Sequence, residues 1–175
     1  MNAIVIYKSK YGSTKQYAEW IADRLCCEVK DAKSVKIGDL EEYDIIVYGG
    51  GLYAEVINGV SLITKNIDKL ANKKIAVFST GITPLDCRDY YDKLVIKKNF
   101  TKDMLENIKV FNFLGKMILK ELSLPHRTAI KALKKLMSSK ENPTEMESLL
   151  IKLCDADGDF TDKTAIEELI AYIEK

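Results

Sequence analysis

Short apolar segments recur along the chain, and each is followed by a segment whose apolar residues have helical spacing. The apolar segments are rich in β-branched residues, as buried strands are. They cover Ala3–Tyr7, Ile45–Tyr48, Lys74–Ser79 and Lys109–Leu114. The segments with helical spacing are Thr14–Cys26, Ser61–Leu70, Arg88–Lys98, a long region after Leu114, and Ala165–Ile173. This alternation predicts a parallel sheet with helices on both faces.

A fifth strand completes the predicted sheet. Cys27–Ala32 is a weaker candidate for an edge strand, and Ile37–Leu40 leads back across the sheet. The other strands are almost continuously apolar, which is typical of strands covered on both faces. Five strands joined by crossovers fit the α/β doubly wound parallel order 2-1-3-4-5. The length of 175 residues and the 47% hydrophobic content predict one domain, residues 1–175, around one core.

Three loops lie where such a fold binds ligands. Ligands bind at the carboxyl ends of the strands, where the winding reverses between the first and third strands. The loops there are Lys8–Ser13, Gly49–Gly59 and Thr80–Asp86, and each is enriched in Gly, Ser, Thr, Asn or Pro. The glycines Gly49–Gly51 are expected to follow the third strand, in the second loop. Together the loops predict a pocket lined by backbone.

The first loop has the features of an anion site. Backbone N–H groups at a turn into a helix are unsatisfied donors, and the helix dipole favours negative charge there. Ser9, Ser13 and Thr14 add hydroxyls, and Gly12 allows a positive φ. The alternative is that Ser13 or Thr14 only caps the helix. The glycine patterns of nucleoside triphosphate and dinucleotide sites are both absent.

The stretches SKYGST, GGGLYAEVINGV and STGIT resemble the phosphate loop and the two flavin-contacting loops of the flavodoxin superfamily. More narrowly, the chain resembles the flavodoxin-domain subfamily that includes menaquinone-dependent protoporphyrinogen oxidase, chiefly through a basic helical stretch after the fifth strand. The resemblance implies a flavodoxin-like fold with a helical insertion after the fifth strand, and FMN as cofactor. The FMN phosphate would be held by Ser9, Lys10, Tyr11, Gly12, Ser13 and Thr14. One face of the isoalloxazine would meet Gly50, Gly51, Leu52, Tyr53 and Ala54, and the other Thr80, Gly81, Ile82 and Thr83.

Two aromatic features depart from the family pattern. Tyr11 stands where flavodoxins usually carry Ser or Thr, which removes one hydroxyl from the phosphate loop. Many flavodoxins stack an aromatic side chain from each flavin loop, whereas this chain has Tyr53 in one loop and no aromatic residue in Thr80–Thr83. The resemblance therefore implies a flavin with one face open to a second reactant; the alternative for Tyr53 is a tyrosine that faces solvent.

No catalytic residue is assigned from the sequence. Protein groups in a flavin site position the ring and set its potential. A peptide flip at Gly50 or Gly51 is expected to be cheap. Asp86–Arg88 could contact a substrate or simply begin the Arg88–Lys98 helix.

The segment 116–140 is strongly basic. It holds seven Lys or Arg against one acid, so it carries +6, while the chain as a whole carries +1 and the remainder therefore −5. Apolar residues with helical spacing are predicted to form one face, with lysines on the other. The apolar residues are Ile130, Leu133, Leu136 and Met137, and the lysines are Lys131, Lys134 and Lys135. Such a helix can lie on an anionic membrane surface, dock an acidic partner, or pack on the sheet with a solvated face.

The remaining chemistry-bearing residues suggest no further site. Four cysteines without a Cys-x-x-Cys pattern and one histidine argue against a metal or disulfide framework. His126 is expected to be structural or on the surface. The aspartates of 155–159 lack the spacing of a calcium loop and predict a turn, with Thr161 or Asp162 capping the last helix. The basic stretch has no interleaved aromatic residues on which bases could stack, which argues against a role in binding nucleic acid.

The leading interpretation is an FMN-dependent oxidoreductase that passes electrons between the flavin and a quinone-like or porphyrinogen-like substrate. A non-enzymatic electron carrier between redox proteins is the first alternative. A flavin-free module that binds a partner is the second. The short, uncharged N-terminal apolar run and the lack of a span of about 20 apolar residues predict a cytoplasmic protein, with peripheral membrane contact through segment 116–140 left open.

Overall fold

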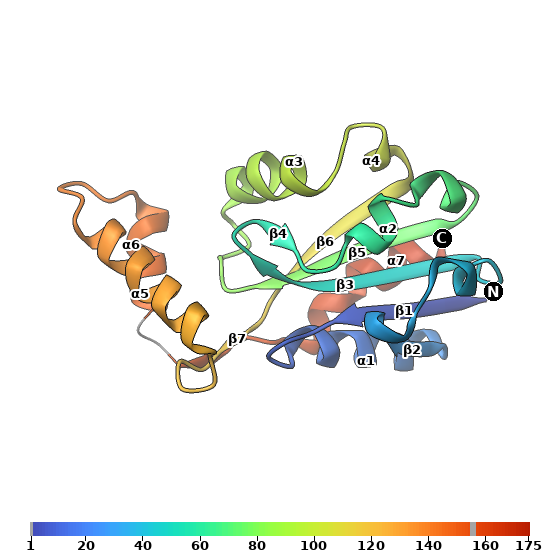
Figure 1. The fold of residues 1–175 in the computed structure, drawn as a ribbon, viewed down its shortest axis with the longest axis horizontal. Coiled ribbons are helices and arrows are strands. Elements are labelled where there is room, and N and C mark those ends of the chain that lie inside the picture. The colour runs from blue at the N-terminus through green and yellow to red at the C-terminus, as the bar shows by residue number, and fades with distance from the viewer. Residues whose placement is uncertain (1, 155–156) are drawn as a thin grey trace.

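The computed structural model describes residues 2–154 and 157–175, and its centre is a five-stranded parallel sheet (Figure 1). The parallel strands are β1 (Ala3–Lys8), β2 (Glu28–Asp31), β3 (Ile45–Tyr53), β5 (Lys74–Gly81) and β6 (Ile108–Leu114). Their order across the sheet is β2-β1-β3-β5-β6, which confirms the predicted order 2-1-3-4-5 when the parallel strands alone are counted. The short β4 (Val56–Ile57) adds antiparallel to the end of β3.

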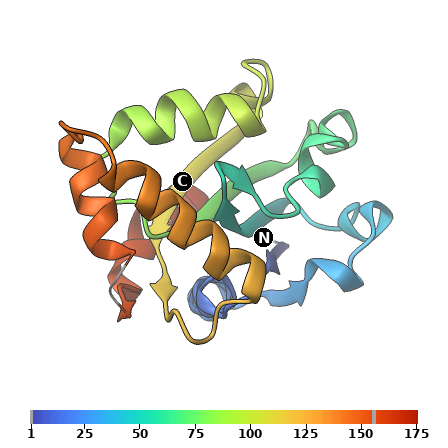
Figure 2. The same ribbon diagram turned by 60° about the vertical axis from the view of Figure 1, so that its left-hand side comes forward.

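Alternating side chains along the strands build a core on each face of the sheet. Ile4 and Ile6 belong to one apolar cluster, and Ala3 and Val5 to the other, because successive side chains of a strand point to opposite faces. Helices α1 (Ser13–Leu25) and α7 (Glu167–Glu174) pack on the Val5 face. Helices α2 (Ser61–Thr64), α3 (Ile96–Asn99) and α4 (Met104–Asn107) lie on the Ile4 face (Figure 2).

The third strand is longer than predicted. Gly49 and Gly50 pair with β1 on one side and with β5 on the other, and Gly51 pairs with β5. The three glycines therefore belong to β3 and not to a loop after it. The reason is space: a Cβ on Gly49 would lie 2.1 Å from the ring of Phe78, and one on Gly50 would lie 2.6 Å from the carbonyl oxygen of Asn58. Close packing over the strand therefore accounts for glycines that read as a loop in the sequence.

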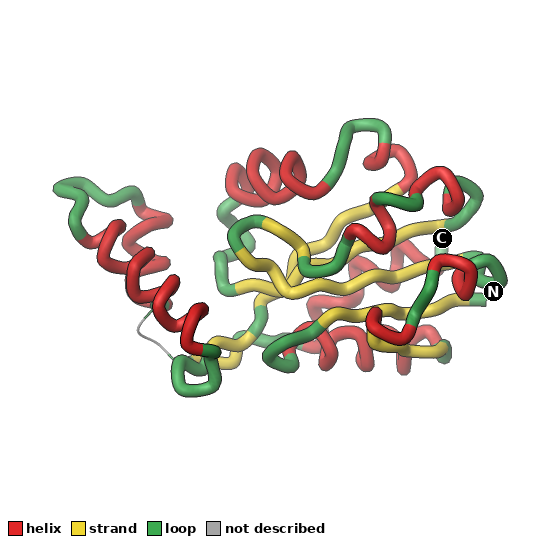
Figure 3. Tube along the Cα trace, viewed as in Figure 1, coloured by secondary structure: helices red, strands yellow, loops and turns green. Residues whose placement is uncertain are grey.

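The predicted helices form with local changes (Figure 3). The segment Ser61–Leu70 divides into α2 and the 3-10 turn η3 (Ile67–Leu70). Residues 88–99 are helical throughout, but η4 (Tyr90–Val95) is a π-helical turn inside this run. Further 3-10 turns are η1 (Ala32–Ser34), η2 (Ile37–Leu40) and η5 (Lys163–Ile166).

A helical insertion follows the fifth parallel strand, as predicted. It runs through β7 (Lys116–Met117), α5 (Leu124–Ser138), α6 (Glu145–Leu153) and β8 (Gly158–Asp159). Strands β7 and β8 pair antiparallel and form a stem, which was not predicted. The two helices project beyond the end of the sheet where β6 stops (Figure 1).

The prediction that four apolar residues of the insertion form one packed face is wrong in part. Met137 is buried and Ile130 half-buried, but Leu133 is 44% and Leu136 64% exposed. The helix packs against α6 at the end of the sheet, so only a narrow stripe is covered. Among the described residues, no helix is both long and apolar enough to cross a bilayer.

The aspartate-rich turn lies partly outside the described residues, at 155–156. Beyond it, the Asp162 carboxylate accepts hydrogen bonds from the backbone N–H and the hydroxyl of Thr164. Asp162 therefore caps the start of η5, as one of the two predicted alternatives.

Candidate functional site

The N-terminus of α1 has no side-chain cap. Gly12 occupies the cap position with φ 97°, and the first helical hydrogen bond runs from the Gln16 N–H to its carbonyl. Neither Ser13 nor Thr14 caps the helix, so that alternative is wrong. Because no side chain caps the first turn, its backbone N–H groups can donate hydrogen bonds to an anion. The positive φ at Gly12 is a conformation that glycine adopts readily.

The hydroxyls of the first loop bond within the protein. The Ser9 hydroxyl accepts from the Gly12 N–H at 3.0 Å, and the Ser13 hydroxyl accepts from the Lys116 N–H at 2.9 Å. The Thr14 and Thr80 hydroxyls lie 2.6 Å apart and are buried. These bonds fix the loop against β5 and β7. An anion here would therefore meet backbone N–H groups more readily than the hydroxyls of Ser13 and Thr14.

Lys116 brings a positive charge to the same loop. Its Nζ lies 3.8 Å from the position that a Cβ on Gly12 would occupy. From the sequence, Lys116 was expected only to be part of the basic segment 116–140. The signal that could have found it is its place just after the fifth strand, because all parallel strands end at the same edge of the sheet. An ammonium group beside uncapped N–H groups suits a phosphate.

The ends of β3 and β5 lie side by side. A Cβ on Gly81 would be 3.5 Å from the Leu52 side chain, so both strand ends can touch one ligand. The ring of Tyr53 lies back over Gly51, about 3.1 Å from the position of a Cβ there. The sequence placed Gly50 to Tyr53, Thr80 and Gly81 in loops, but they belong to β3 and β5.

The segments that follow these strand ends are fixed by turns and hydrogen bonds. Ala54 and Glu55 form the two-residue turn between β3 and β4, both with positive φ, at 46° and 62°. Ile82 and Thr83 follow β5, and the Thr83 carbonyl accepts from the Tyr91 hydroxyl at 2.6 Å. Gly51 accepts from the Asn58 N–H, so a peptide flip there would break a hydrogen bond at the end of β3.

The insertion reaches this site through its first helical turn. The Tyr11 hydroxyl lies 2.7 Å from His126 Nδ1 and accepts from the Ser123 N–H at 3.2 Å. Lys10 Nζ donates to the Ser123 hydroxyl at 3.2 Å. The His126 ring also lies 5.0 Å from the Tyr53 ring, tilted by 38°. His126, expected to be structural or on the surface, therefore stands at the candidate site, and Tyr53 faces it instead of open solvent.

The contacts change the acidity of these side chains. Burial raises the pKa of Tyr53 to about 12. Burial also acts to raise the pKa of Tyr11, but hydrogen bonds with Ser123 and the charge of Lys10 outweigh it and lower that pKa below its ordinary value. Burial, followed by the charge of Lys10, lowers the pKa of His126. A neutral imidazole is therefore favoured at the site.

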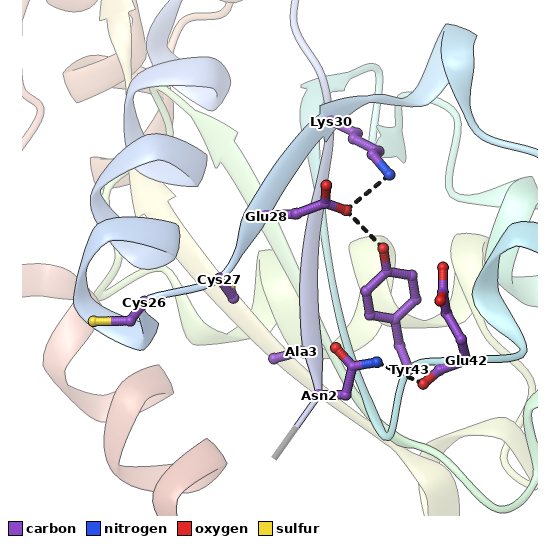
Figure 4. Close-up of a pocket in the computed structure, with 8 residues that line it drawn as sticks. All are labelled: Asn2, Ala3, Cys26, Cys27, Glu28, Lys30, Glu42 and Tyr43. Carbon is purple, nitrogen blue, oxygen red and sulfur yellow. Dashed lines mark hydrogen bonds and ion pairs between the residues drawn. The ribbon is translucent and has the colours of Figure 1, made fainter.

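A pocket of about 450 Å³ lies at the opposite end of the sheet (Figure 4). The Glu28 carboxylate there accepts hydrogen bonds from the Tyr43 hydroxyl at 2.7 Å and from Lys30 at 2.8 Å. These bonds, that of Lys30 first, lower the pKa of Glu28. The pocket is formed at the amino ends of β1 and β2, so it is separate from the three loops. Its lining is Asn2, Ala3, Cys26, Cys27, Glu28, Lys30, Glu42 and Tyr43.

Comparison with known proteins gives the family. The family described as "Flavodoxin domain" matches residues 4–145. A protein of Methanocaldococcus jannaschii, described as uncharacterized, is 30% identical over 125 residues, which cover 69% of this chain and 75% of that protein.

Solved structures similar to this chain include two flavoproteins. Oxidised Flavodoxin 2 from Bacillus cereus is 16% identical, with 99% of both chains covered and a TM-score of 0.48. A flavoprotein in complex with FMN from Lactobacillus acidophilus is also 16% identical. The match covers 65% of this chain and 91% of that chain, with a TM-score of 0.41.

Proposed function

This chain belongs to the flavodoxin domain family, and from that premise we propose that it binds FMN at the carboxyl edge of its sheet and acts as an oxidoreductase. The observation that carries the proposal is the N-terminus of α1. It has uncapped backbone donors, a glycine with φ 97° and the Lys116 ammonium group beside it. This combination suits a phosphate monoester.

The residues divide between the two ends of the cofactor. Backbone N–H groups from Ser9 to Thr14, other than that of Gly12, would hold the phosphate together with Lys116, while the side chains of Ser9, Ser13 and Thr14 keep the loop in shape. The isoalloxazine would lie against the ends of β3 and β5, from Gly50 to Ala54 and from Thr80 to Thr83. Flavin, when bound, supplies one- and two-electron chemistry. The protein positions it and sets the polarity around it.

The binding test compares FMN with riboflavin, which lacks the phosphate. We expect the purified protein to retain FMN through gel filtration. In Lys116→Gln, FMN affinity should fall at least about 10-fold, because a hydrogen bond to a charged group is worth about 1.5–3 kcal/mol, while riboflavin affinity stays unchanged. Lys120→Gln is the matched control, since Lys120 lies in the same segment but is exposed. A wild-type protein that retains no flavin at micromolar concentration would refute the proposal and leave a flavin-free partner-binding module.

The substrate class is a finer proposal. By resemblance to the subfamily of menaquinone-dependent protoporphyrinogen oxidase, a quinone-like or porphyrinogen-like molecule would exchange electrons with the flavin. Steady-state assays with a soluble naphthoquinone test this directly. A long-lived one-electron reduced state with no turnover of small substrates would instead indicate an electron carrier between proteins.

A peripheral membrane contact is proposed for the insertion. Leu124 is 75% and Leu136 64% exposed on α5, next to exposed lysines such as Lys131 and Lys135. Apolar side chains flanked by lysines favour an anionic lipid surface. Co-sedimentation with anionic vesicles should be strong at low salt and weaker at high salt. Equal recovery in the supernatant with and without vesicles would exclude the contact.

A further inference from the structure

The insertion and the phosphate loop share one hydrogen-bond network. The Tyr11 hydroxyl is the centre: it meets the Ser123 N–H and hydroxyl, both at 3.2 Å, and His126 Nδ1 at 2.7 Å. Lys10 joins through the Ser123 hydroxyl and lies 5.5 Å from the centre of the Tyr11 ring. Three segments far apart in the chain therefore meet here: the phosphate loop, the end of β3 at Tyr53, and the first turn of α5.

Lys10 Nζ and the Ser123 N–H can only donate, and one arrangement of the network also uses both hydroxyl protons. Lys10 donates to the Ser123 hydroxyl, whose own proton is then available to the Tyr11 oxygen. In that arrangement the Tyr11 oxygen accepts from the Ser123 N–H and the Ser123 hydroxyl, and the Tyr11 hydroxyl donates its own proton to His126. His126 Nδ1 is then an acceptor, and the proton of the neutral ring lies on Nε2.

The outer nitrogen of this histidine is available to a ligand. Among the backbone groups and side chains that the structure describes, none is hydrogen-bonded to Nε2 of His126, and the His126 side chain is half-buried beside Tyr53. The turn that carries it is held firmly. The Arg127 guanidinium donates to the carbonyls of Leu119 and Lys120 at 3.1 and 2.9 Å. The donor is therefore fixed in place before any ligand binds.

We propose that the insertion is a cap on the flavin site: Tyr11 anchors the first turn of α5, and His126 Nε2–H donates a hydrogen bond to an acceptor oxygen of the bound flavin. This role explains why the phosphate loop has a tyrosine where Ser or Thr is usual, because the hydroxyl binds the cap and not the phosphate. The inference rests on the proposed flavin site and adds the first turn of α5 to the residues that would line it. His126 is a binding residue, and Tyr11 is a positioning residue that acts through it.

The test uses the fact that His126 is the only histidine in the chain. Its imidazole NMR signals therefore report this residue alone. In the wild-type protein we expect the Nε2–H tautomer, and a clear shift of these signals when FMN is added. Tyr11→Phe removes the anchor and should move the tautomer ratio even without FMN, which a purely structural loss elsewhere would not do.

Affinity measurements with single-residue variants complete the test. His126→Phe should bind FMN about 10-fold more weakly, whereas His126→Gln, whose amide can donate from nearly the same place, should stay within about 3-fold of wild type. Tyr11→Phe should lie between them. Lys135→Gln, on the exposed side of α5, is the control and should bind FMN as the wild type does. Should His126→Phe fold poorly, the Gln and Tyr11 variants with the NMR signals still decide.

Each other outcome has a distinct meaning. If FMN binds but leaves the His126 signals and the affinity of His126→Phe unchanged, the cap is refuted while the flavin site stands. If the affinity rises when the ring is removed in His126→Ala, the histidine blocks the site, and the cap is refuted as well. If the wild type binds no FMN, both the flavin site and the cap are refuted.

Discussion

Replacing Gly49 by Ala tests whether a central strand needs glycine for space. Gly49 pairs with Tyr7 on one side and with Phe78 on the other. A Cβ at Gly49 would lie 2.1 Å from Phe78 Cζ and 2.5 Å from both Cε atoms. That distance is about 1.4 Å short of the ordinary contact of about 3.5 Å, so either the ring or the strand must move.

The surroundings of Phe78 make that movement costly. The ring is fully buried and lies against Phe113 at 5.4 Å and Tyr17 at 6.5 Å between centroids. Overpacking in a well-packed core costs roughly 1–3 kcal/mol. Because the shortfall is large and the ring is enclosed, we expect Gly49→Ala to lower the free energy of unfolding by about 3 kcal/mol, or the melting temperature by roughly 6–12 °C.

Urea unfolding of a double-mutant cycle measures the clash. Phe78→Leu destabilises by itself, but in Gly49→Ala/Phe78→Leu the total loss should be smaller than the two losses added, by at least about 1 kcal/mol. Gly38→Ala is the matched control, since a Cβ there meets nothing within 4 Å, and it should be neutral or stabilising. A Gly49→Ala loss below about 0.5 kcal/mol, or additive losses in the cycle, would refute the reasoning.

Three further predictions concern other parts of the molecule. Tyr17→Phe should lower the free energy of unfolding by about 1–3 kcal/mol. The reason is that the buried hydroxyl donates to the Leu114 carbonyl at 2.9 Å and accepts from the Asp162 N–H at 3.0 Å. A urea unfolding curve unchanged from wild type would contradict this. Burial raises the pKa of Cys27 to about 11, and only the thiolate reacts with an alkylating reagent. The rate of Cys27 alkylation, followed by mass spectrometry, should therefore be slow at pH 8 and increase about tenfold per pH unit up to that pKa. A rate that stays constant above pH 8 would show that the thiol is already ionised. Ala54→Gly should raise the free energy of unfolding by up to about 1 kcal/mol, since Ala54 has φ 46° in a two-residue hairpin turn; a loss of stability would mean that the turn is not strained.

The sheet could be predicted from the sequence because each central strand is recognisable from its own apolar residues, without knowledge of distant contacts. Ile4, Val5 and Ile6 lie in an apolar run, and such a run covered on both faces has few alternatives to a central parallel strand. The end of β3 could not be predicted in this way. Gly49–Gly51 look like a loop until the ring of Phe78 and the backbone at Asn58 are known to lie on them, and those contacts come from distant parts of the chain.

The candidate site shows the same limit. The phosphate loop was predicted from Ser9–Thr14, since a turn into a helix has local sequence signals. Those signals do not say where each hydroxyl points, and Ser13 and Thr14 bond to Lys116 and Thr80 instead of facing outward. His126 had no local signal at all. More than 100 residues separate it from Tyr11, and only the folding of the insertion brings them together.

The stem of the insertion has a consequence for evolution and for engineering. Lys116 pairs with Asp159 and Met117 with Gly158, so the chain leaves and re-enters the sheet domain at neighbouring points. A segment whose two ends meet can be gained, lost or exchanged without altering the path of the strands around it. The forty residues between these ends could therefore be replaced by a short turn while the strands of the sheet keep their path.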